Sequence, residues 1–444
     1  MPGGPYLVVG LARSGEAVVR LLAARGEEVV GVDSGAPPAA AGLTGPGVEI
    51  SLDDDGLGHI ARIRCVVKSP GVPGQAPAIA AARERGIPVL GELELAWRLL
   101  PNRFVAVTGT NGKTTVAELL GEIWRAAGEP VVVAGNVGTP LASLVGEVSP
   151  HAAVVCEASS FQLEDTLDFA PECAALLNVS PDHIDRHGDL DAYLDAKLRI
   201  FANQGPGDVA VLNGCEPALE GRELEGAARR VAFCGSCEAA GCEIHSAAGT
   251  IIAGGEPLIG LDELAIPGAH NAENAMAAAG CALAMGLGRK AVVAGLRAFA
   301  GVPHRLERVA EVGGVGYVND SKATNVAAAR AAVLAFSEPV HVILGGSSKG
   351  ESFGALAEPL TGHARAAYLI GATAADLERD LEAAWEAGVE HDRYPDLEAA
   401  FAAASAAAEP GEVVLLAPAC ASFDAHRDYE ERGERFRSLA EALS

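Results

Sequence analysis

One short stretch of the sequence, Thr108–Thr115, combines glycines, hydroxyls and a lysine, reading T-G-T-N-G-K-T-T. Gly109 and Gly112 allow the backbone to curl so that its N–H groups face a polyphosphate, and the helix that follows adds its positive end. Lys113 is suited to reach the β- and γ-phosphates of ATP, and Thr114 to bind Mg²⁺. The spacing is shorter than the common G-x4-G-K-[ST] form, so a Gly-rich turn is the alternative. We interpret the stretch as an ATP-binding phosphate loop made of Gly109, Thr110, Asn111, Gly112, Lys113, Thr114 and Thr115.

Further along the chain, three residues of the right chemistry follow this loop. Glu157 is a hard oxygen ligand suited to the metal ions that ATP chemistry on a carboxylate needs. His183 has two interpretations, a helix-start or core histidine and a second metal ligand. Because Glu157 and the phosphate loop accompany it, we favour the ligand. Lys197 lies on a predicted helix, where a solvated face is the simpler interpretation.

Polar residues in the last third of the chain could bind the rest of a nucleotide. Asn271 and Asn274 are spaced i, i+3 on one face of a predicted helix, and side-chain amides can pair with an adenine edge. Arg305 is suited to clamp a phosphate. Asp320, between a predicted strand and a helix, is suited to ribose hydroxyls.

Near the N-terminus, the segment Gly10–Gly15 follows a first predicted strand, and Asp33 ends a second. This pattern indicates nucleotide binding only weakly. The segment lacks the G-x-G-x-x-G pattern, which argues against a nicotinamide cofactor.

The elements that must position these residues are strands alternating with helices. Apolar runs before each loop predict buried strands, and the helical spacing that follows predicts parallel sheets wrapped by helices. The pattern restarts twice, and a hairpin is expected around Gly313-Gly314. We therefore predict an α/β protein of three domains, each a mainly parallel sheet with flanking helices. The expected bounds are 1–93, Rossmann-like; 94–300, the phosphate-loop domain; and 301–444, Rossmann-like.

Composition excludes several classes of function. The 444 residues carry a net charge of −26, which disfavours binding to nucleic acid or anionic lipid. No apolar run reaches about 18 residues and no signal segment opens the chain, so we expect a cytoplasmic protein without membrane insertion. The nine cysteines then predict reduced thiols. Cys234, Cys237, Cys242 and His245 have roughly metal-ligand spacing, but we favour thiols in a hairpin over structural zinc.

The motif T-G-T-N-G-K-T-T resembles that of the Mur ligases and folylpolyglutamate synthases, and the resemblance to Mur ligases covers nearly the full chain. It implies an ATP-dependent amide ligase, acting through an acyl phosphate in peptidoglycan precursor synthesis, and hence in cell-wall biogenesis, cell shape and division. The segments 319–325 and 418–425 resemble those of members that add D-glutamate to UDP-N-acetylmuramoyl-L-alanine. The motifs of members that add a diamino acid or the first alanine are absent. We expect a monomer with small-molecule substrates.

Residue roles follow from this resemblance. It implies that Lys197 is carbamylated by CO₂, and that two Mg²⁺ sites are formed by Thr114, Glu157, His183 and carbamylated Lys197. The implied catalytic residues are Lys113, Glu157, His183 and Lys197. The implied UDP-sugar residues are Leu11, Arg13, Ser14, Gly15, Asp33, Ser34, Ser69, Gly71, Asn136 and Ser159. The implied D-glutamate residues are His183, Lys322, Thr324, Lys349, Ser422 and Phe423.

The sequence departs from the family pattern in two places. Ser347 and Ser348 stand where an Asp commonly precedes the lysine, here Lys349, and Gly35 stands where a polar side chain is common. The alternatives are another Mur-type or folylpolyglutamate-synthase-like ligase and a non-catalytic nucleotide-sugar sensor. The N-terminal domain argues against a folylpolyglutamate synthase, because those enzymes start near the phosphate loop. The intact Lys113, Glu157, His183 and Lys197 argue against a non-catalytic sensor.

Overall fold

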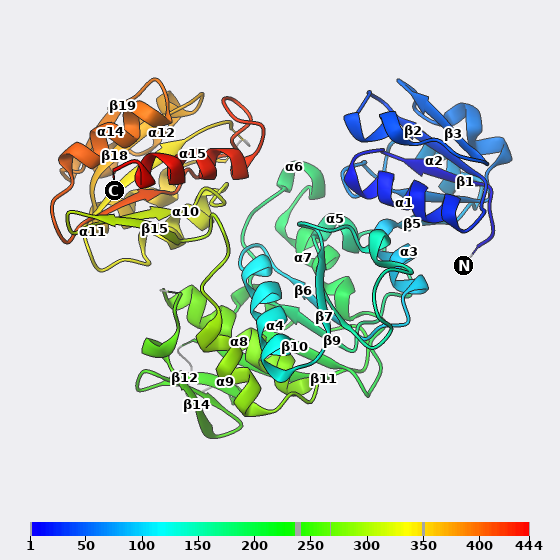
Figure 1. Ribbon diagram of the computed structural model, residues 1–444, viewed down its shortest axis with the longest axis horizontal. Coiled ribbons are helices and arrows are strands. Elements are labelled where there is room, and N and C mark those ends of the chain that lie inside the picture. Colours follow the sequence, from blue (N-terminus) through cyan, green and yellow to red (C-terminus); the bar gives the residue numbers. More distant parts are fainter. Residues whose placement is uncertain (1, 236–240, 267, 349–350, 444) are drawn as a thin grey trace. The chain divides into compact units, whose positions relative to one another are not determined.

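The computed structural model describes residues 2–235, 241–266, 268–348 and 351–443. The chain divides into two compact units. The first unit comprises Met1–Leu261 and Glu273–Ala298, and the second Asp262–Ala272 and Phe299–Ser444. Three sheets of five, nine and six strands form the cores (Figure 1). The predicted α/β fold of three domains with mainly parallel sheets is confirmed, whereas the domain bounds stay predictions.

The N-terminal sheet has the strand order β3-β2-β1-β4-β5, and all its pairs are parallel. In β1 (Tyr6–Val9), side chains alternate between two faces: Tyr6 and Val8 pack towards α1, and Leu7 and Val9 towards α2. Burial on both faces explains why the strand is apolar throughout. The other elements are α1 (Arg13–Ala24), β2 (Val29–Asp33), β3 (Val48–Leu52), β4 (Cys65–Lys68), α2 (Pro77–Glu84) and β5 (Val89–Gly91).

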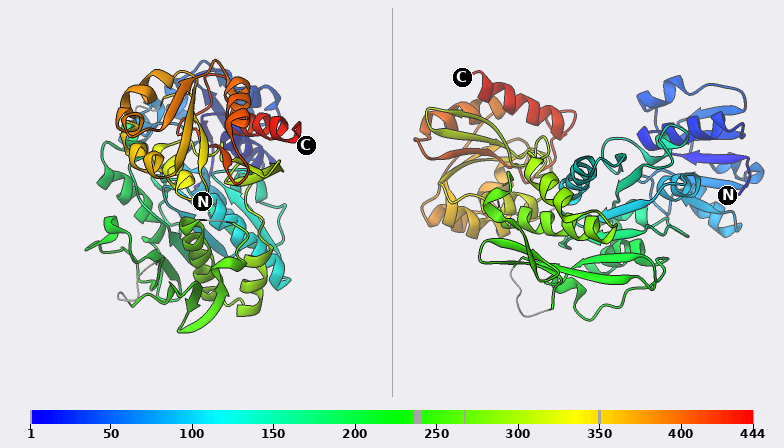
Figure 2. Two further views of the ribbon diagram at one scale, coloured as in Figure 1. Left: turned by 90° about the vertical axis from the view of Figure 1, so that its left-hand side faces the viewer. Right: turned by 60° about the horizontal axis from the view of Figure 1, so that its bottom comes forward.

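The central sheet has the order β14-β13-β12-β11-β10-β9-β6-β8-β7, parallel from β7 to β12 and antiparallel beyond (Figure 2). Helix α4 packs on β7, β8 and α9. Its strands are β6 (Phe104–Thr108), β7 (Val131–Gly135), β8 (Ala153–Glu157), β9 (Cys173–Leu176), β10 (Val209–Asn213), β11 (Arg229–Cys234), β12 (Ile244–Ala247), β13 (Thr250–Ala253) and β14 (Glu256–Gly260). The helices from this part of the chain are α3 (Glu92–Leu99), α4 (Lys113–Ala127), α5 (Ser160–Leu163), α6 (Ile184–His187), α7 (Leu190–Leu198), α8 (Ala269–Ala284) and α9 (Arg289–Ala298).

The C-terminal sheet has the order β15-β16-β20-β17-β18-β19 and is parallel except for the predicted hairpin β15–β16. One face packs against α10 and α11, the other against α14 and α15. Its strands are β15 (Glu307–Val312), β16 (Val315–Asn319), β17 (Val340–Gly345), β18 (Ala364–Ile370), β19 (Glu390–Arg393) and β20 (Val413–Leu416). Its helices are α10 (Val326–Val333), α11 (Ala357–His363), α12 (Ala374–Asp380), α13 (Glu382–Glu386), α14 (Leu397–Ala407) and α15 (Tyr429–Glu441).

The cysteines correct one prediction. Cys215 and Cys234 form a disulfide, so the expectation of reduced thiols is wrong for this pair, which the fold brings together from neighbouring strand ends. The disulfide also takes Cys234 out of the considered zinc set, in which Cys237 lies outside the described residues. Among the residues that the structure describes, every helix is too short or too polar to cross a lipid bilayer.

Candidate functional site

The predicted phosphate loop connects β6 to α4 as expected. Gly112 has φ +85° at the N-cap of α4, and a Cβ placed there would lie 2.3 Å from Oδ1 of Asn274. Only glycine fits this turn, and Asn274 is thereby placed directly beside the loop. The Lys113 ammonium donates to the carbonyls of Gly109, at 2.9 Å, and Thr110, at 2.8 Å. The cation is therefore held at the loop itself.

Asn178 and Ser180, which follow β9, hold the phosphate loop in shape. The Asn178 side chain accepts from the Asn111 N–H at 2.8 Å and donates to the Asn111 carbonyl at 3.1 Å. The Ser180 N–H donates to the Thr110 hydroxyl at 3.0 Å, and this hydroxyl lies 3.3 Å from the Tyr193 hydroxyl. These contacts were not predicted from the sequence, because they join residues about seventy positions apart.

Glu157 ends β8 next to the loop and is buried. The Thr114 hydroxyl donates to its Oε2 at 2.7 Å, and the Asn136 amide donates to its Oε1 at 2.9 Å. The structure therefore brings together three of the predicted site residues. They form a cluster of hard oxygen atoms beside the cation of Lys113.

Lys197 is not on a solvated helix face. Its side chain is buried, and Nζ donates to the Gly109 carbonyl at 2.8 Å. Burial and the nearby Lys113 charge hold the pKa of Lys197 well below its ordinary value, and Asp182 opposes the shift only in part. The fold thus favours a neutral amine at the phosphate loop.

His183 occupies the N-cap position of α6 with φ +54°, but its side chain makes no capping hydrogen bond. The ring lies against Phe161, with centroids 4.7 Å apart, and Nε2 is 3.7 Å from Asp182 Oδ2. The backbone therefore satisfies the simpler interpretation, a helix start, while the metal-ligand role of His183 stays a prediction.

The donor set is compatible with Mg²⁺. Thr114 and Glu157 offer oxygen atoms within hydrogen-bond distance of each other, the type of ligand that Mg²⁺ prefers. Across the described ranges, no group of three or more His, Cys, Asp or Glu side chains could hold a metal ion by itself. A further anionic ligand on Lys197 would remedy this shortage, and the lowered pKa of its amine suits that chemistry.

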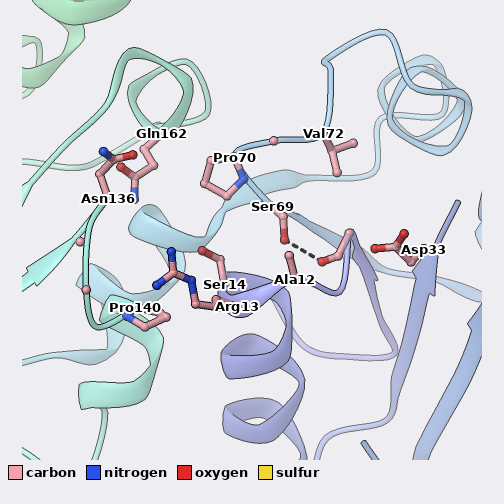
Figure 3. A pocket seen from close by; sticks show the side chains of 14 residues that line it. Ala12, Arg13, Ser14, Asp33, Ser69, Pro70, Val72, Asn136, Pro140 and Gln162 are labelled. Atoms are coloured by element: carbon pink, nitrogen blue, oxygen red, sulfur yellow. Dashed lines mark hydrogen bonds between the residues drawn. The ribbon is translucent and has the colours of Figure 1, made fainter. Parts of the chain in front are cut away.

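A cavity of about 400 Å³ lies in the first unit at the start of α1 (Figure 3). Figure 3 shows Arg13 and Ser14 at the start of α1 on one side, and Asn136 and Gln162 on another. The cavity is lined by Gly10, Ala12, Arg13, Ser14, Asp33, Ser69, Pro70, Gly71, Val72, Gly135, Asn136, Gly138, Pro140 and Gln162. Six of the ten predicted sugar-nucleotide residues line it: Arg13, Ser14, Asp33, Ser69, Gly71 and Asn136.

The loop at this cavity is held by side chains from two other strands. Asp33 accepts from the N–H of Leu11 at 2.7 Å and of Gly35 at 2.9 Å. The Ser69 hydroxyl donates to the Gly10 carbonyl at 2.7 Å (Figure 3). A Cβ on Gly15 would lie only 1.8 Å from that carbonyl oxygen, so glycine is required where α1 begins.

Four of the ten residues do not line the cavity: Leu11, Gly15, Ser34 and Ser159. Ser159 instead caps α5 in a capping box, in which its hydroxyl and the Gln162 side chain satisfy each other's backbone N–H groups. Gln162, which was not predicted, lines the cavity in its place.

In the second unit, two of the predicted nucleotide residues, Asp320 and Arg305, lie near each other. The Asp320 carboxylate is buried, and the backbone N–H of Leu306 provides it with a hydrogen bond. Arg305 lies 3.7 Å away, and burial raises the pKa of Asp320. Burial and then Arg305 lower the pKa of His270 to about 4. Asn271, the next residue in α8, is also buried.

Two predicted D-glutamate segments also meet in the second unit. Ser347, just before Lys349, pairs by backbone with Ala421, just before Ser422. Lys349 itself lies outside the described residues. Phe423 is 74% exposed, and Lys322 lies over the Tyr429 ring at 5.5 Å. Thr324 precedes Asn325, which caps α10.

Arg432, which was not predicted as a site residue, holds the 319–324 and 418–422 loops together. Its side chain is fully buried, and its guanidinium donates to the Ser321 hydroxyl at 3.0 Å and to the Ser321 carbonyl at 2.9 Å. It also donates to the carbonyls of Cys420, at 3.0 Å, and Ala421, at 3.3 Å. Burial lowers the pKa of Arg432 to about 10. Cys420 itself is buried in the hydrophobic core of this domain.

The fold and these sites define a nucleotide-binding α/β protein, and comparison with known proteins specifies it further. Residues 5–91 match the family described as Mur ligase MurD-like, N-terminal domain. Residues 107–282 match the Mur ligase middle domain, and residues 304–420 match the Mur ligase, glutamate ligase domain.

Relatives that match over nearly the whole chain indicate the same family. A UDP-N-acetylmuramoylalanine–D-glutamate ligase from Pelotomaculum thermopropionicum is 44% identical, covering 98% of this chain and 97% of its own. One from Geobacter metallireducens is 42% identical, covering 99% and 98%. The solved UDP-N-acetylmuramate–alanine ligase from Thermotoga maritima has a TM-score of 0.62 at 19% identity, covering 99% and 100%, and shares the fold. The chain belongs to the Mur ligase family, among relatives named UDP-N-acetylmuramoylalanine–D-glutamate ligase.

Proposed function

We propose that this chain is an ATP-dependent ligase that adds D-glutamate to the carboxylate of UDP-N-acetylmuramoyl-L-alanine, releasing ADP and phosphate. It would act in the cytoplasm, in the synthesis of peptidoglycan precursors. The observation that carries the proposal is the cluster of Lys113, Thr114 and Glu157 at the phosphate loop, in the same unit as the α1 cavity. Similarity to ligases of this name over nearly the whole chain supports the substrates.

In the first step, a substrate carboxylate oxygen attacks the γ-phosphorus of ATP, the bond to the β-phosphate oxygen breaks, and ADP leaves. Lys113 offsets the charge that accumulates on the transferred group, which is mainly electrostatic catalysis. The product is an acyl phosphate. The D-glutamate amine then attacks its carbonyl carbon, and phosphate leaves as the amide bond forms. We propose His183 or a nearby group as the acceptor of the proton that the attacking amine loses.

Magnesium would be held by Thr114, Glu157, His183 and carbamylated Lys197, at two sites. Bound there, it would neutralise phosphate oxygens and reduce repulsion from the substrate carboxylate. The carbamate forms when the neutral Lys197 amine attacks the carbon of CO₂ and loses a proton. The buried position and lowered pKa of Lys197 support this modification.

We assign the remaining residues by their places in the fold. The α1 cavity, with Asn136 and Gln162, takes the sugar nucleotide. Asn274, beside Gly112, and Asn271 take the adenine edge. Asp320 takes the ribose hydroxyls, because its carboxylate offers acceptor oxygens directly after β16. Arg305 takes phosphate. The proposed D-glutamate residues are His183, Lys322, Thr324, Lys349, Ser422 and Phe423.

The test is phosphate release from ATP with UDP-N-acetylmuramoyl-L-alanine and a panel of D- and L-amino acids. Release that requires both the nucleotide and D-glutamate, with the amide product seen by mass spectrometry, is the expected result. Release at the same rate without any amino acid, or a preference for another amino acid, would contradict the proposal.

A further inference from the structure

Arg186, in α6, reaches from the central domain to the wall of the α1 cavity. Its guanidinium donates to three successive backbone carbonyls, those of Pro70 at 3.3 Å, Gly71 at 3.5 Å and Val72 at 3.3 Å. All three residues line the cavity. The planar fork of arginine can serve several acceptors at once, which a lysine cannot do in the same way. The Arg186 side chain therefore holds the backbone of residues 70–72 in place.

The charge of Arg186 is compensated locally. Its side chain is 14% exposed, and the Glu164 carboxylate lies 2.9 Å from it. The neighbouring acid, Asp165, pairs with the fully buried Lys68 at 2.7 Å, and Lys68 also donates to the Val72 carbonyl at 2.8 Å. Two paired cations therefore support the same cavity wall. Breaking either pair leaves a poorly solvated charge, so the arrangement is held firmly.

The other side of Arg186 faces the catalytic region. Its guanidinium carbon lies 4.4 Å from the centroid of the Phe161 ring, a cation–π contact. Phe161 packs against His183 at 4.7 Å and stacks on His187 at 5.5 Å. Gln162, the next residue of α5, lines the cavity. A continuous set of contacts thus joins the cavity wall to the His183 ring through one arginine and one phenylalanine.

We propose that Arg186 is a positioning residue that couples the nucleotide cavity to His183, so that a correctly seated sugar nucleotide also sets the imidazole. The inference rests on the proposed function of this site. Arg186 is proposed to contact none of the reacting atoms. It acts through the 70–72 wall, which governs nucleotide binding, and through Phe161, which governs the position of the His183 ring.

The experiment compares Arg186→Ala and Arg186→Lys with the unsubstituted protein. Nucleotide binding is measured by calorimetry with UDP-N-acetylmuramoyl-L-alanine, and kcat by phosphate release with D-glutamate. For Arg186→Ala we expect about tenfold weaker nucleotide binding and about tenfold lower kcat, typical of a lost positioning contact. Arg186→Lys should recover part of both. ATP affinity should change by less than about twofold, because the phosphate loop is held by Asn178.

Arg83→Ala is the matched control. Arg83 also donates to a backbone carbonyl of the N-terminal domain, that of Gly74 at 2.9 Å, and also lies near Asp165, at 3.5 Å. Its side chain is half exposed and contacts Gly74 and Asp165 rather than the segment 70–72 or Phe161. Binding and kcat of this variant should stay within about twofold of the unsubstituted protein.

Phe161→Leu separates coupling from simple structural support. It should lower kcat and leave nucleotide binding nearly unchanged, since Arg186 still holds the wall. The double variant combines Arg186→Ala and Phe161→Leu. Its kcat should be no lower than that of Arg186→Ala alone, because both substitutions break the same set of contacts between the cavity wall and the His183 ring.

Three outcomes would overturn the proposal: Arg186→Ala behaving like Arg83→Ala, ATP affinity falling as far as nucleotide affinity, or additive effects in the double variant. Failure of the unsubstituted protein to bind the nucleotide would overturn the proposed function, and this inference with it. Normal binding by the unsubstituted protein together with unchanged binding by Arg186→Ala would overturn this inference alone.

Discussion

The loop at Gly10–Gly15 and the loop at Gly109–Thr115 both connect a buried parallel strand to the start of a helix. Each is held from outside by polar side chains, among them Asp33 and Ser69 in the first and Asn178 and Lys197 in the second. The difference lies in what surrounds the helix start. The first loop carries an exposed arginine, Arg13, whereas the second has a lysine bonded to its own carbonyls next to a buried carboxylate.

This difference indicates that the same arrangement of strand, loop and helix serves two purposes, holding a phosphate group and reacting with one. Backbone N–H groups and a helix end are enough to hold a phosphate group of a nucleotide that does not react. Transfer of a phosphoryl group also requires charge placed where negative charge develops, and a low-dielectric surrounding strengthens that charge. The first loop is therefore assigned to holding and the second to reaction. Substitutions in the two loops should separate these purposes.

The largest effect is expected from replacing the positively charged side chain of each loop. Lys113→Met should lower kcat about 10³-fold or more, because it removes the charge that stabilises the transferred phosphoryl group. Arg13→Met, the matched change in the first loop, should mainly raise KM for the sugar nucleotide and lower kcat less than about threefold. Steady-state phosphate release with each substrate varied measures both. A comparable loss of kcat in the two variants would contradict the division of roles.

Lys197→Ala should have the next largest effect, a loss of activity of about 10²-fold, if a carbamate contributes to metal binding. A carbamate carbon signal should appear by ¹³C NMR after addition of ¹³C-labelled bicarbonate and be absent from the variant. The variant should show normal thermal unfolding. A labelled signal that persists in Lys197→Ala, or none in the unsubstituted protein, would contradict the assignment.

The pH dependence of Lys197 follows from burial and the Lys113 charge, which lower its pKa in the fold. At pH values between the lowered pKa of Lys197 and its ordinary pKa near 10.4, the unfolded chain binds more protons than the folded chain. The unmodified amine therefore makes the free energy of unfolding rise with pH across this window. Carbamate formation needs the neutral amine and should increase in the same direction.

Local patterns explain what could be predicted from the sequence. A helix is predicted directly after the phosphate loop, and α4 begins there because the glycine loop ends where helical spacing starts. β3 and β19 were not predicted, since these edge strands are largely exposed and lack an apolar run. The residues that hold the loops, such as Asn178, Arg186 and Arg432, act through partners distant in the sequence. Their side chains carry no local signal of this role, and the Cys215–Cys234 disulfide is a similar case.

A smaller effect is expected from the support of the second loop. Asn178→Ala removes two hydrogen bonds to Asn111 and should raise KM for ATP about tenfold, equivalent to ~1.4 kcal/mol. Asn213→Ala is the control, because its buried amide contacts Leu177 and Cys215 at a neighbouring strand end instead. It should lower thermal stability to a similar extent and leave KM for ATP within about twofold. Equal KM values for the two variants would mean that Asn178 supports the fold and not the loop in particular.

The smallest effect is expected from Asp33, the corresponding support of the first loop. Asp33→Asn keeps the size of the side chain, but one of its two acceptor oxygens becomes a donor that faces a backbone N–H, that of Leu11 or Gly35. KM for the sugar nucleotide should rise about three- to fivefold, whereas kcat and KM for ATP stay unchanged, because this loop holds a group that does not react. Varying each substrate at saturation of the others measures the three constants separately. A fall in kcat at saturating nucleotide would show that the first loop also shapes the reacting site, and the two loops could then no longer be assigned separate purposes.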